Sequence, residues 1–126
     1  MKIRIKTQRY DKWREDIRNR AEEGEWETWD AVKVQSLVNP DNTYRRLVHV
    51  PGDDHQYEDI QLMLSTPTKE EAKRGEGYLD IVPKLRRGVK MEDEEFHAKS
   101  AVVLGRFCEV LNRYFPSLRS YTVILK

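Results

Sequence analysis

The stretch DEEFHAKSAVVLGRFCEVLNRY, residues 93–114, decides the fold predicted for this chain. Its apolar residues recur every three or four positions, which is the spacing of one face of an α-helix. They are Phe96, Ala101, Val103, Leu104, Phe107, Cys108, Val110, Leu111 and Tyr114. A helix that is apolar over more than half of its circumference must be covered, most simply by a β-sheet.

The ends of this helix and one position inside it are also marked in the sequence. Asp93 is the expected N-cap, because its carboxylate can accept a hydrogen bond from a backbone N–H of the first turn, and Pro116 ends the helix. Glu95–Lys99 and Glu109–Arg113 have the i,i+4 spacing of stabilising ion pairs, with the acid first. Gly105 costs about 1 kcal/mol relative to alanine inside a helix, so we expect a neighbouring backbone to come close there.

Length and composition predict one folded domain over residues 1–126. Charged residues make up 36% of the chain and hydrophobic residues 38%, and the net charge is +1. The hydrophobic residues are periodic rather than scattered, which favours a folded domain over a disordered one. A net charge this small gives no overall attraction to nucleic acid or to a membrane.

Cysteine usage and the N-terminal residues predict an intracellular, cytoplasmic protein. The single cysteine, Cys108, excludes a disulfide framework within the chain and fits a reducing compartment. Residues 1–6 alternate charged and apolar side chains and so do not form the apolar core of a signal peptide. No apolar run approaches the roughly 18 residues that span a bilayer. We expect no membrane partner and no cofactor.

Two shorter helical segments are expected besides the long helix. Residues 11–23 predict a helix that Asp11 caps, with a narrow apolar stripe made of Trp13, Ile17 and Ala21. Thr68 and Glu71 have the spacing of a capping box, which predicts one or two helical turns after them.

The remaining segments predict strands, because apolar and polar residues alternate along them. These segments are residues 2–7, 26–38, 44–50, 57–65, 78–82 and 121–125. The turn at residues 39–42 joins the second and third of them into a hairpin. The last strand is apolar on both faces and is expected to be central. Pro83 is expected to end its strand or to place that strand at an edge.

This order of elements predicts an α+β domain. Its largely antiparallel sheet has five to six strands, and two helices pack on it. A ferredoxin-like β-α-β-β-α-β core with an inserted hairpin is one topology consistent with the order. In that topology the first and last strands are neighbours in the sheet.

The first strand has a basic face with two interpretations. Lys2, Arg4 and Lys6 alternate with Ile3 and Ile5, so the basic side chains share one side of the strand. Such residues either protect an exposed sheet edge from pairing with other chains or form an anion-binding surface.

The second interpretation leads to a nucleic-acid-binding hypothesis. If the first strand lies near the loop that follows Pro83, eight basic residues converge on one surface: Lys2, Arg4, Lys6, Arg45, Arg46, Arg86, Arg87 and Lys90. Tyr10, Tyr44, Tyr57 or Trp29 would then supply stacking surfaces, as on sheet-based single-strand binders. No RNP-type motif is present, and acidic residues nearly equal basic ones, so this function is the alternative hypothesis.

A metal-dependent hydrolase is the less favoured alternative. Imidazole and carboxylate groups gather around one hairpin end: His49, Asp53, Asp54, His55, Glu58 and Asp59. Their spacing matches no metal motif, and turns recruit aspartate for backbone reasons alone. The chain has no nucleophile elbow, Walker A loop or H-E-x-x-H motif. We therefore assign no catalytic residue and no metal ligand.

The leading hypothesis is a non-catalytic protein-interaction or adaptor domain that binds a protein partner. A homodimer is one possible form of this interaction. Residues 1–20 hold eight basic and three acidic residues, whereas residues 21–30 hold five acidic residues and no basic one. Opposed charge blocks of this kind steer specific partners. Trp26 and Trp29 are the predicted contact, since tryptophan is enriched in binding hot spots.

Overall fold

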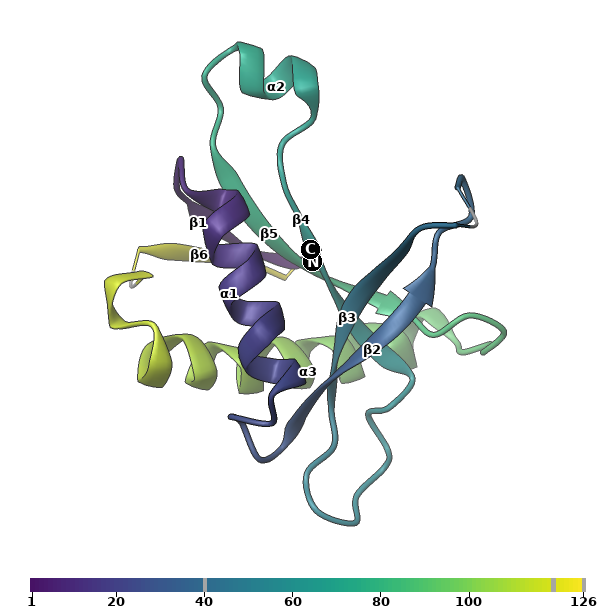
Figure 1. The fold of residues 1–126 in the computed structure, drawn as a ribbon. Coiled ribbons are helices and arrows are strands. Elements are labelled where there is room, and N and C mark those ends of the chain that lie inside the picture. The colour runs from purple at the N-terminus through teal and green to yellow at the C-terminus, as the bar shows by residue number, and fades with distance from the viewer. Residues whose placement is uncertain (40, 119, 126) are drawn as a thin grey trace.

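The computed structural model describes residues 1–39, 41–118 and 120–125. Within these ranges the chain forms six strands, two long helices, one short helix and a 3-10 turn (Figure 1). In chain order they are β1 (Lys2–Lys6), α1 (Tyr10–Glu22), β2 (Trp29–Gln35), β3 (Thr43–His49), β4 (Ile60–Ser65), α2 (Lys69–Lys73), β5 (Tyr78–Leu85), α3 (Asp93–Tyr114), η1 (Pro116–Leu118) and β6 (Tyr121–Ile124). Pro40, in the predicted turn between β2 and β3, lies outside the described residues.

The six described strands form one antiparallel sheet in the order β2-β3-β4-β5-β1-β6. This sheet and its helices confirm the predicted α+β class. β1 and β6 are neighbours, with Ile3 opposite Val123, as the proposed topology requires. β2 and β3 form the predicted hairpin, in which Trp29 lies opposite His49. The ferredoxin-like arrangement of the other elements stays a prediction.

One face of the sheet carries the hydrophobic core. Ile3 and Ile5 of β1 pair with Ile81 and Leu79 of β5, and all four side chains are buried. Both long helices contribute to the same cluster, with Ile17, Ala21, Val103, Leu104, Phe107, Val110 and Leu111. α1 and α3 therefore pack on this one face, and they run in different directions across it (Figure 1).

We call the opposite side of the sheet the open face, because in the described chain α1 and α3 both lie on the core side and α2 projects from the end of β4 and β5 (Figure 1). Strand residues alternate between the two faces. The open face therefore carries Lys2, Arg4, Lys6, Tyr44, Arg46, Val48, Gln61, Met63, Tyr78, Asp80 and Val82. Val48 illustrates this placement, since it is buried yet lies outside the core cluster.

Three strand predictions are wrong in the structure. β1 lies between β5 and β6, so its basic residues do not protect a sheet edge, and β6 is an edge strand rather than a central one. Val123 is accordingly 41% exposed. Pro83 lies inside β5. β5 pairs with β1 only as far as Ile81, so at Pro83 the described sheet has a neighbouring strand on the β4 side alone. A residue without a backbone N–H is tolerated where one side of the strand has no hydrogen-bonding partner.

The helix starts differ from the sequence prediction, except in α2. Asp93 is the first residue of α3, and Asp11 lies inside the first turn of α1, so neither is an N-cap. Both carboxylates still lie near a helix N-terminus, where the helix dipole favours negative charge. The predicted capping box is present, because Thr68 Oγ1 accepts from the Glu71 N–H and the Glu71 carboxylate accepts from the Thr68 N–H.

Helix α3 ends before Pro116 as predicted, but two expectations inside it are wrong. Gly105 is exposed, and a Cβ there would meet no atom within 4 Å, so no neighbouring backbone comes close. Of the two predicted ion pairs, Glu95–Lys99 is confirmed at 3.0 Å, whereas Glu109 and Arg113 make no ion pair among the described residues. Neither α3 nor any other helix in the described ranges is long and apolar enough to cross a membrane.

Trp26 and Trp29 belong to the core. Their exposed fractions are 2% and 5%. Both indole rings meet Phe107 of α3 edge-on, with centroid distances of 6.1 Å and 5.2 Å. Trp26 also packs against Phe115 at 5.9 Å. Their side chains are therefore not exposed for a protein contact, and the contact predicted at these two residues stays a prediction.

Candidate nucleic-acid interface

The basic residues of β1 lie together on the open face. Arg4 donates from Nε to Asp80 Oδ1 at 2.8 Å and from Nη2 to Oδ2 at 2.9 Å. Lys2 Nζ donates to the same carboxylate at 3.2 Å. The hydrogen bond with buried Asp80 raises the pKa of Arg4. One carboxylate therefore holds two cations, and Lys6, which is exposed, extends the positive charge along the strand.

Tyr78 provides an aromatic surface beside these cations. The Arg4 guanidinium carbon lies 4.0 Å from the centroid of the Tyr78 ring. The Tyr78 hydroxyl donates to Glu71 Oε1 at 2.9 Å, which orients the ring. Tyr78 was not among the predicted site residues. The sequence did contain a signal for it, because residues two apart in a strand, such as Tyr78 and Asp80, lie on the same face of the sheet.

Arg46 of β3 is a buried cation with neutral partners. It is 8% exposed. Its Nη1 donates to Gln61 Oε1 at 3.2 Å and its Nη2 donates to the Tyr44 hydroxyl at 3.1 Å. Among the described residues it makes no ion pair, and its Nε–H has no acceptor. Burying a charge without an opposite charge is costly, so an anion bound at this place would offset that cost.

The loop after β5 lies beside this arginine. Arg86 fixes the loop to the sheet, because its Nε and Nη2 contact Asp59 Oδ1 at 2.9 Å and 2.7 Å and its backbone N–H donates to the Asp59 carbonyl at 2.8 Å. Arg87 is exposed and its Nη2 donates to the Tyr44 hydroxyl at 3.4 Å. The Tyr44 hydroxyl thus links Arg87 to Arg46.

Two adjoining hollows lie between this loop and strands β2 to β4. Their volumes are about 380 and 220 Å³, and Val32, Gln61 and Arg86 line both. We call them together the open-face groove. Arg87 lines the larger hollow, whereas Asp30 lines the smaller one. An anionic ligand would therefore be favoured toward the Arg87 end.

Six of the eight predicted basic residues lie on or beside the open face: Lys2, Arg4, Lys6, Arg46, Arg86 and Arg87. β5 and β4 separate β1 from β3. With about 4.8 Å between neighbouring strands, the backbones of β1 and β3 are about 14 Å apart. The other two residues lie elsewhere. Arg45 projects to the core side and pairs with Glu22 at 3.0 Å, and Lys90 is exposed in the loop before α3.

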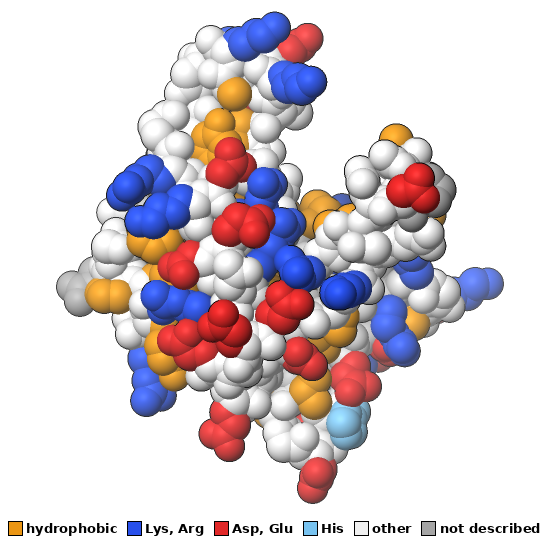
Figure 2. All heavy atoms as spheres, in the orientation of Figure 1, with side chains coloured by type: hydrophobic (Ala, Val, Ile, Leu, Met, Phe, Trp, Pro, Cys, Tyr) orange, Lys and Arg blue, Asp and Glu red, His pale blue; other side chains and the backbone are white. Residues whose placement is uncertain are grey.

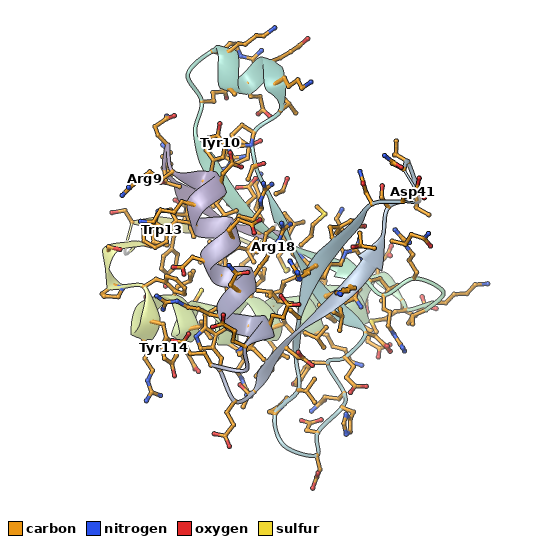
Figure 3. All side chains as sticks on the ribbon, in the orientation of Figure 1. Arg9, Tyr10, Trp13, Arg18, Asp41 and Tyr114 are labelled. Carbon is orange, nitrogen blue, oxygen red and sulfur yellow. The ribbon has the colours of Figure 1, made fainter. Side chains whose placement is uncertain are left out.

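A second group of arginines, Arg14 and Arg18 of α1, lies beside Arg45. Figure 3 shows Arg18 pointing from α1 toward the β2–β3 hairpin, and Figure 2 shows basic and acidic side chains mixed over this side of the molecule. Burial, and then the Arg14 guanidinium, lower the pKa of Arg18. Arg14 pairs with Asp11 at 3.0 Å and Arg18 with Glu15 at 3.3 Å. Each of these arginines thus already has a carboxylate.

The residues of the metal hypothesis do not come together. His49 is buried on the core side, where its Nδ1 lies 3.1 Å from the Thr28 carbonyl oxygen. His55 is exposed and pairs with Glu58. The described part of the chain contains no group of three or more His, Cys, Asp or Glu side chains that could hold a metal ion.

No protein-family model, curated protein or solved structure matches this chain. A functional proposal must therefore come from its own side chains. The open face offers the most specific arrangement, because it combines a buried arginine, exposed cations and two tyrosines.

Proposed function

We propose that the protein binds single-stranded nucleic acid on the open face of its sheet, without catalysis. The observation that carries this proposal is the Arg46 guanidinium, which is buried and donates to Gln61 of the groove wall. Among the described residues its hydrogen-bond partners are the neutral Gln61 and Tyr44 alone. A phosphodiester supplies the negative charge that this cation lacks. Phosphate contacts from arginine and lysine provide most of the affinity in such complexes.

The other parts of the open face suit the same ligand. Tyr44 and Tyr78 are partly exposed, and each lies against an arginine guanidinium. Bases stack on aromatic rings of this kind with little dependence on sequence. Tyr44 lies in β3 and Tyr78 in β5. The exposed Lys6 lies in β1, next to β5, and the exposed Arg87 lies in the loop after β5, and both would contact phosphates.

The test is fluorescence anisotropy with labelled single strands of mixed sequence, RNA and DNA, at several salt concentrations. We expect the affinity to fall steeply with salt. A Lys6→Gln/Arg87→Gln variant removes two exposed cations, and the slope of log K against log salt should fall by about 0.7 for each phosphate that the variant no longer neutralises. The matched control is Arg106→Gln/Arg113→Gln, which makes the same charge change on α3.

Two results would contradict this proposal. The first is the absence of binding at low salt. The second is equal weakening by both double variants, which would show an effect of net charge rather than of the open face. Binding of a polyglutamate peptide in place of the oligonucleotides would instead favour an acidic protein partner.

A protein contact at the β2 edge is the second candidate, and the observation that favours it is an exposed apolar tip. β2 is the terminal strand at one side of the described sheet. Just after it, Leu37 and Val38 are 82% and 95% exposed. An exposed edge strand is a template for pairing with another chain. We propose a second copy of the chain, paired along β2, as the partner.

Sedimentation velocity over a range of protein concentrations tests this second proposal. We expect a dimer that a Leu37→Ser/Val38→Ser variant weakens. Leu125→Ser, at the opposite edge of the sheet, is the control, since Leu125 is also exposed. A wild-type protein that stays monomeric at every concentration would remove the homodimer.

A further inference from the structure

A hollow of about 310 Å³ lies between α3 and the segment that leads into β2. We call it the α3 pocket. Its buried lining residues are Trp26, Trp29, His49 and Val110, and its volume is at the lower end of the roughly 300–1,000 Å³ typical of small-molecule sites. It shares no lining residue with the open-face groove, so an inference drawn from it is independent of the proposed function.

His49 gives the α3 pocket a hydrogen-bond acceptor. The side chain is 2% exposed, and its Nδ1 lies 3.1 Å from the Thr28 carbonyl oxygen. A carbonyl only accepts, so Nδ1 carries the proton and Nε2 of the neutral ring has a free lone pair. Nε2 is buried and has no partner in the described chain. Burial, followed by the Arg106 charge, lowers the pKa of His49 and keeps the ring neutral.

Trp26 gives the same pocket a hydrogen-bond donor. Its indole N–H is buried and also lacks a partner among the described residues. Buried polar atoms are rarely left unpaired in folded proteins. Two residues that line the pocket thus carry an unpaired donor and an unpaired acceptor, and both atoms are buried in this structure.

The rim of the α3 pocket is charged. Arg106, Glu109 and Arg113 line it from α3, and within the described chain none of them makes an ion pair. Two cations and one anion favour a ligand that carries a negative group beside a donor. The apolar wall contributed by Pro51 and Tyr114 favours a nonpolar body.

We propose that the α3 pocket binds a small carboxylic acid with an apolar body and a hydroxyl or amino group next to its carboxylate. Arg106, Arg113 and the Trp26 N–H are the donors for the carboxylate. His49 Nε2 accepts from the hydroxyl or amino group. The tryptophan and tyrosine rings contact the apolar body.

The test uses two-dimensional proton–nitrogen NMR spectra of the full chain, which report the indole N–H of each tryptophan separately. Phenyllactate and phenylalanine are the probes. Phenylpropionate, which lacks the donor, and phenylethanol, which lacks the carboxylate, are the matched controls. We expect phenyllactate or phenylalanine to shift the Trp26 indole signal in a saturable way. Phenylpropionate should bind roughly tenfold more weakly, the value of one hydrogen bond, and phenylethanol should not saturate.

Variants separate the α3 pocket from the open face. Arg106→Gln/Arg113→Gln should weaken phenyllactate or phenylalanine by roughly tenfold or more while the protein stays folded, because both side chains are exposed. Lys6→Gln/Arg87→Gln should leave the binding unchanged. No shift of the Trp26 signal with millimolar probe would overturn the proposal, and so would equal shifts with all four compounds.

Discussion

Arg4 and Asp80 form a two-point hydrogen bond across neighbouring strands, at 2.8 Å and 2.9 Å. Lys2 shares the same carboxylate at 3.2 Å. Asp80 is only 5% exposed, so one buried acid positions two cations on a sheet face that has no helix over it in the described chain. The ion pairs of β1 therefore belong to the proposed nucleic-acid surface, and Asp80 limits the positive charge of that surface.

Asp80→Asn should lower the stability of the protein but raise its affinity for nucleic acid. The amide keeps the shape of the side chain but loses its charge, so we expect unfolding free energy to fall by about 1–3 kcal/mol, as for a lost hydrogen bond to a charged group. The same change frees Lys2 and Arg4, so affinity for single-stranded nucleic acid should rise severalfold at low salt. Urea denaturation and fluorescence anisotropy measure the two effects.

Glu95→Gln is the control for Asp80→Asn. It removes the same charge from the exposed pair with Lys99 on α3. Exposed pairs contribute little, so stability should change by less than about 1 kcal/mol. If Asp80→Asn left the nucleic-acid affinity unchanged while the protein stayed folded, Lys2 and Arg4 would not belong to the binding surface.

Phe107→Ala should be strongly destabilising, because this ring joins α3 to the start of β2. Phe107 is fully buried and meets Trp26 and Trp29 edge-on. Removing a buried aromatic ring typically costs about 3–5 kcal/mol. Val102→Ala, on the exposed side of α3, should cost less than about 1 kcal/mol. Similar urea midpoints for the two variants would contradict the placement of Phe107 in the core.

Side-chain periodicity predicted the buried faces of α3 and β1. The helical spacing of α3 placed Leu104, Phe107 and Leu111 in the core, and they are buried. The alternation of β1 separated Ile3 and Ile5 from the basic residues, and the structure keeps that separation. These predictions succeeded because burial of one face follows directly from the repeat of the element.

Side-chain periodicity could not predict the strand order or the contacts between residues that are distant in sequence. Apolar and polar residues can alternate in the same way in an edge strand and in an interior strand. The pattern therefore could not show that β1 is interior and that β6 is at an edge. Trp26 and Trp29 are large enough to be either hot spots or core residues. Their burial depends on Phe107, which is distant in sequence. The α3 pocket was missed for the same reason, because His49 and Arg106 come together only in the fold.

His49 should make stability depend on pH. Its pKa is lowered below the ordinary 6.5, chiefly by burial and then by Arg106, while the Thr28 carbonyl and the Asp54 and Glu109 charges act in the opposite direction. The unfolded chain therefore binds a proton at this residue more readily than the folded chain. Unfolding free energy should fall as pH drops from about 7 to about 5, since protons then favour the unfolded state. Urea denaturation at several pH values measures this dependence.

His49→Asn removes this titration and should flatten the pH dependence in that range. His97→Asn, the same substitution at an exposed site on α3, is the matched control. Parallel pH curves for the wild type and His49→Asn would show that His49 is not held neutral by the fold.

Gly105→Ala should stabilise the protein, which reverses the expectation from the sequence. Gly105 is exposed within α3, and a Cβ there would meet no atom within 4 Å. Alanine should therefore raise unfolding free energy by about 0.5–1 kcal/mol through its higher helix propensity. The control is Gly88→Ala, where space is also free but φ is +82°, so alanine should cost about 1 kcal/mol or more. If Gly105→Ala lowered the urea midpoint as Gly88→Ala does, the glycine would be needed for packing against a partner.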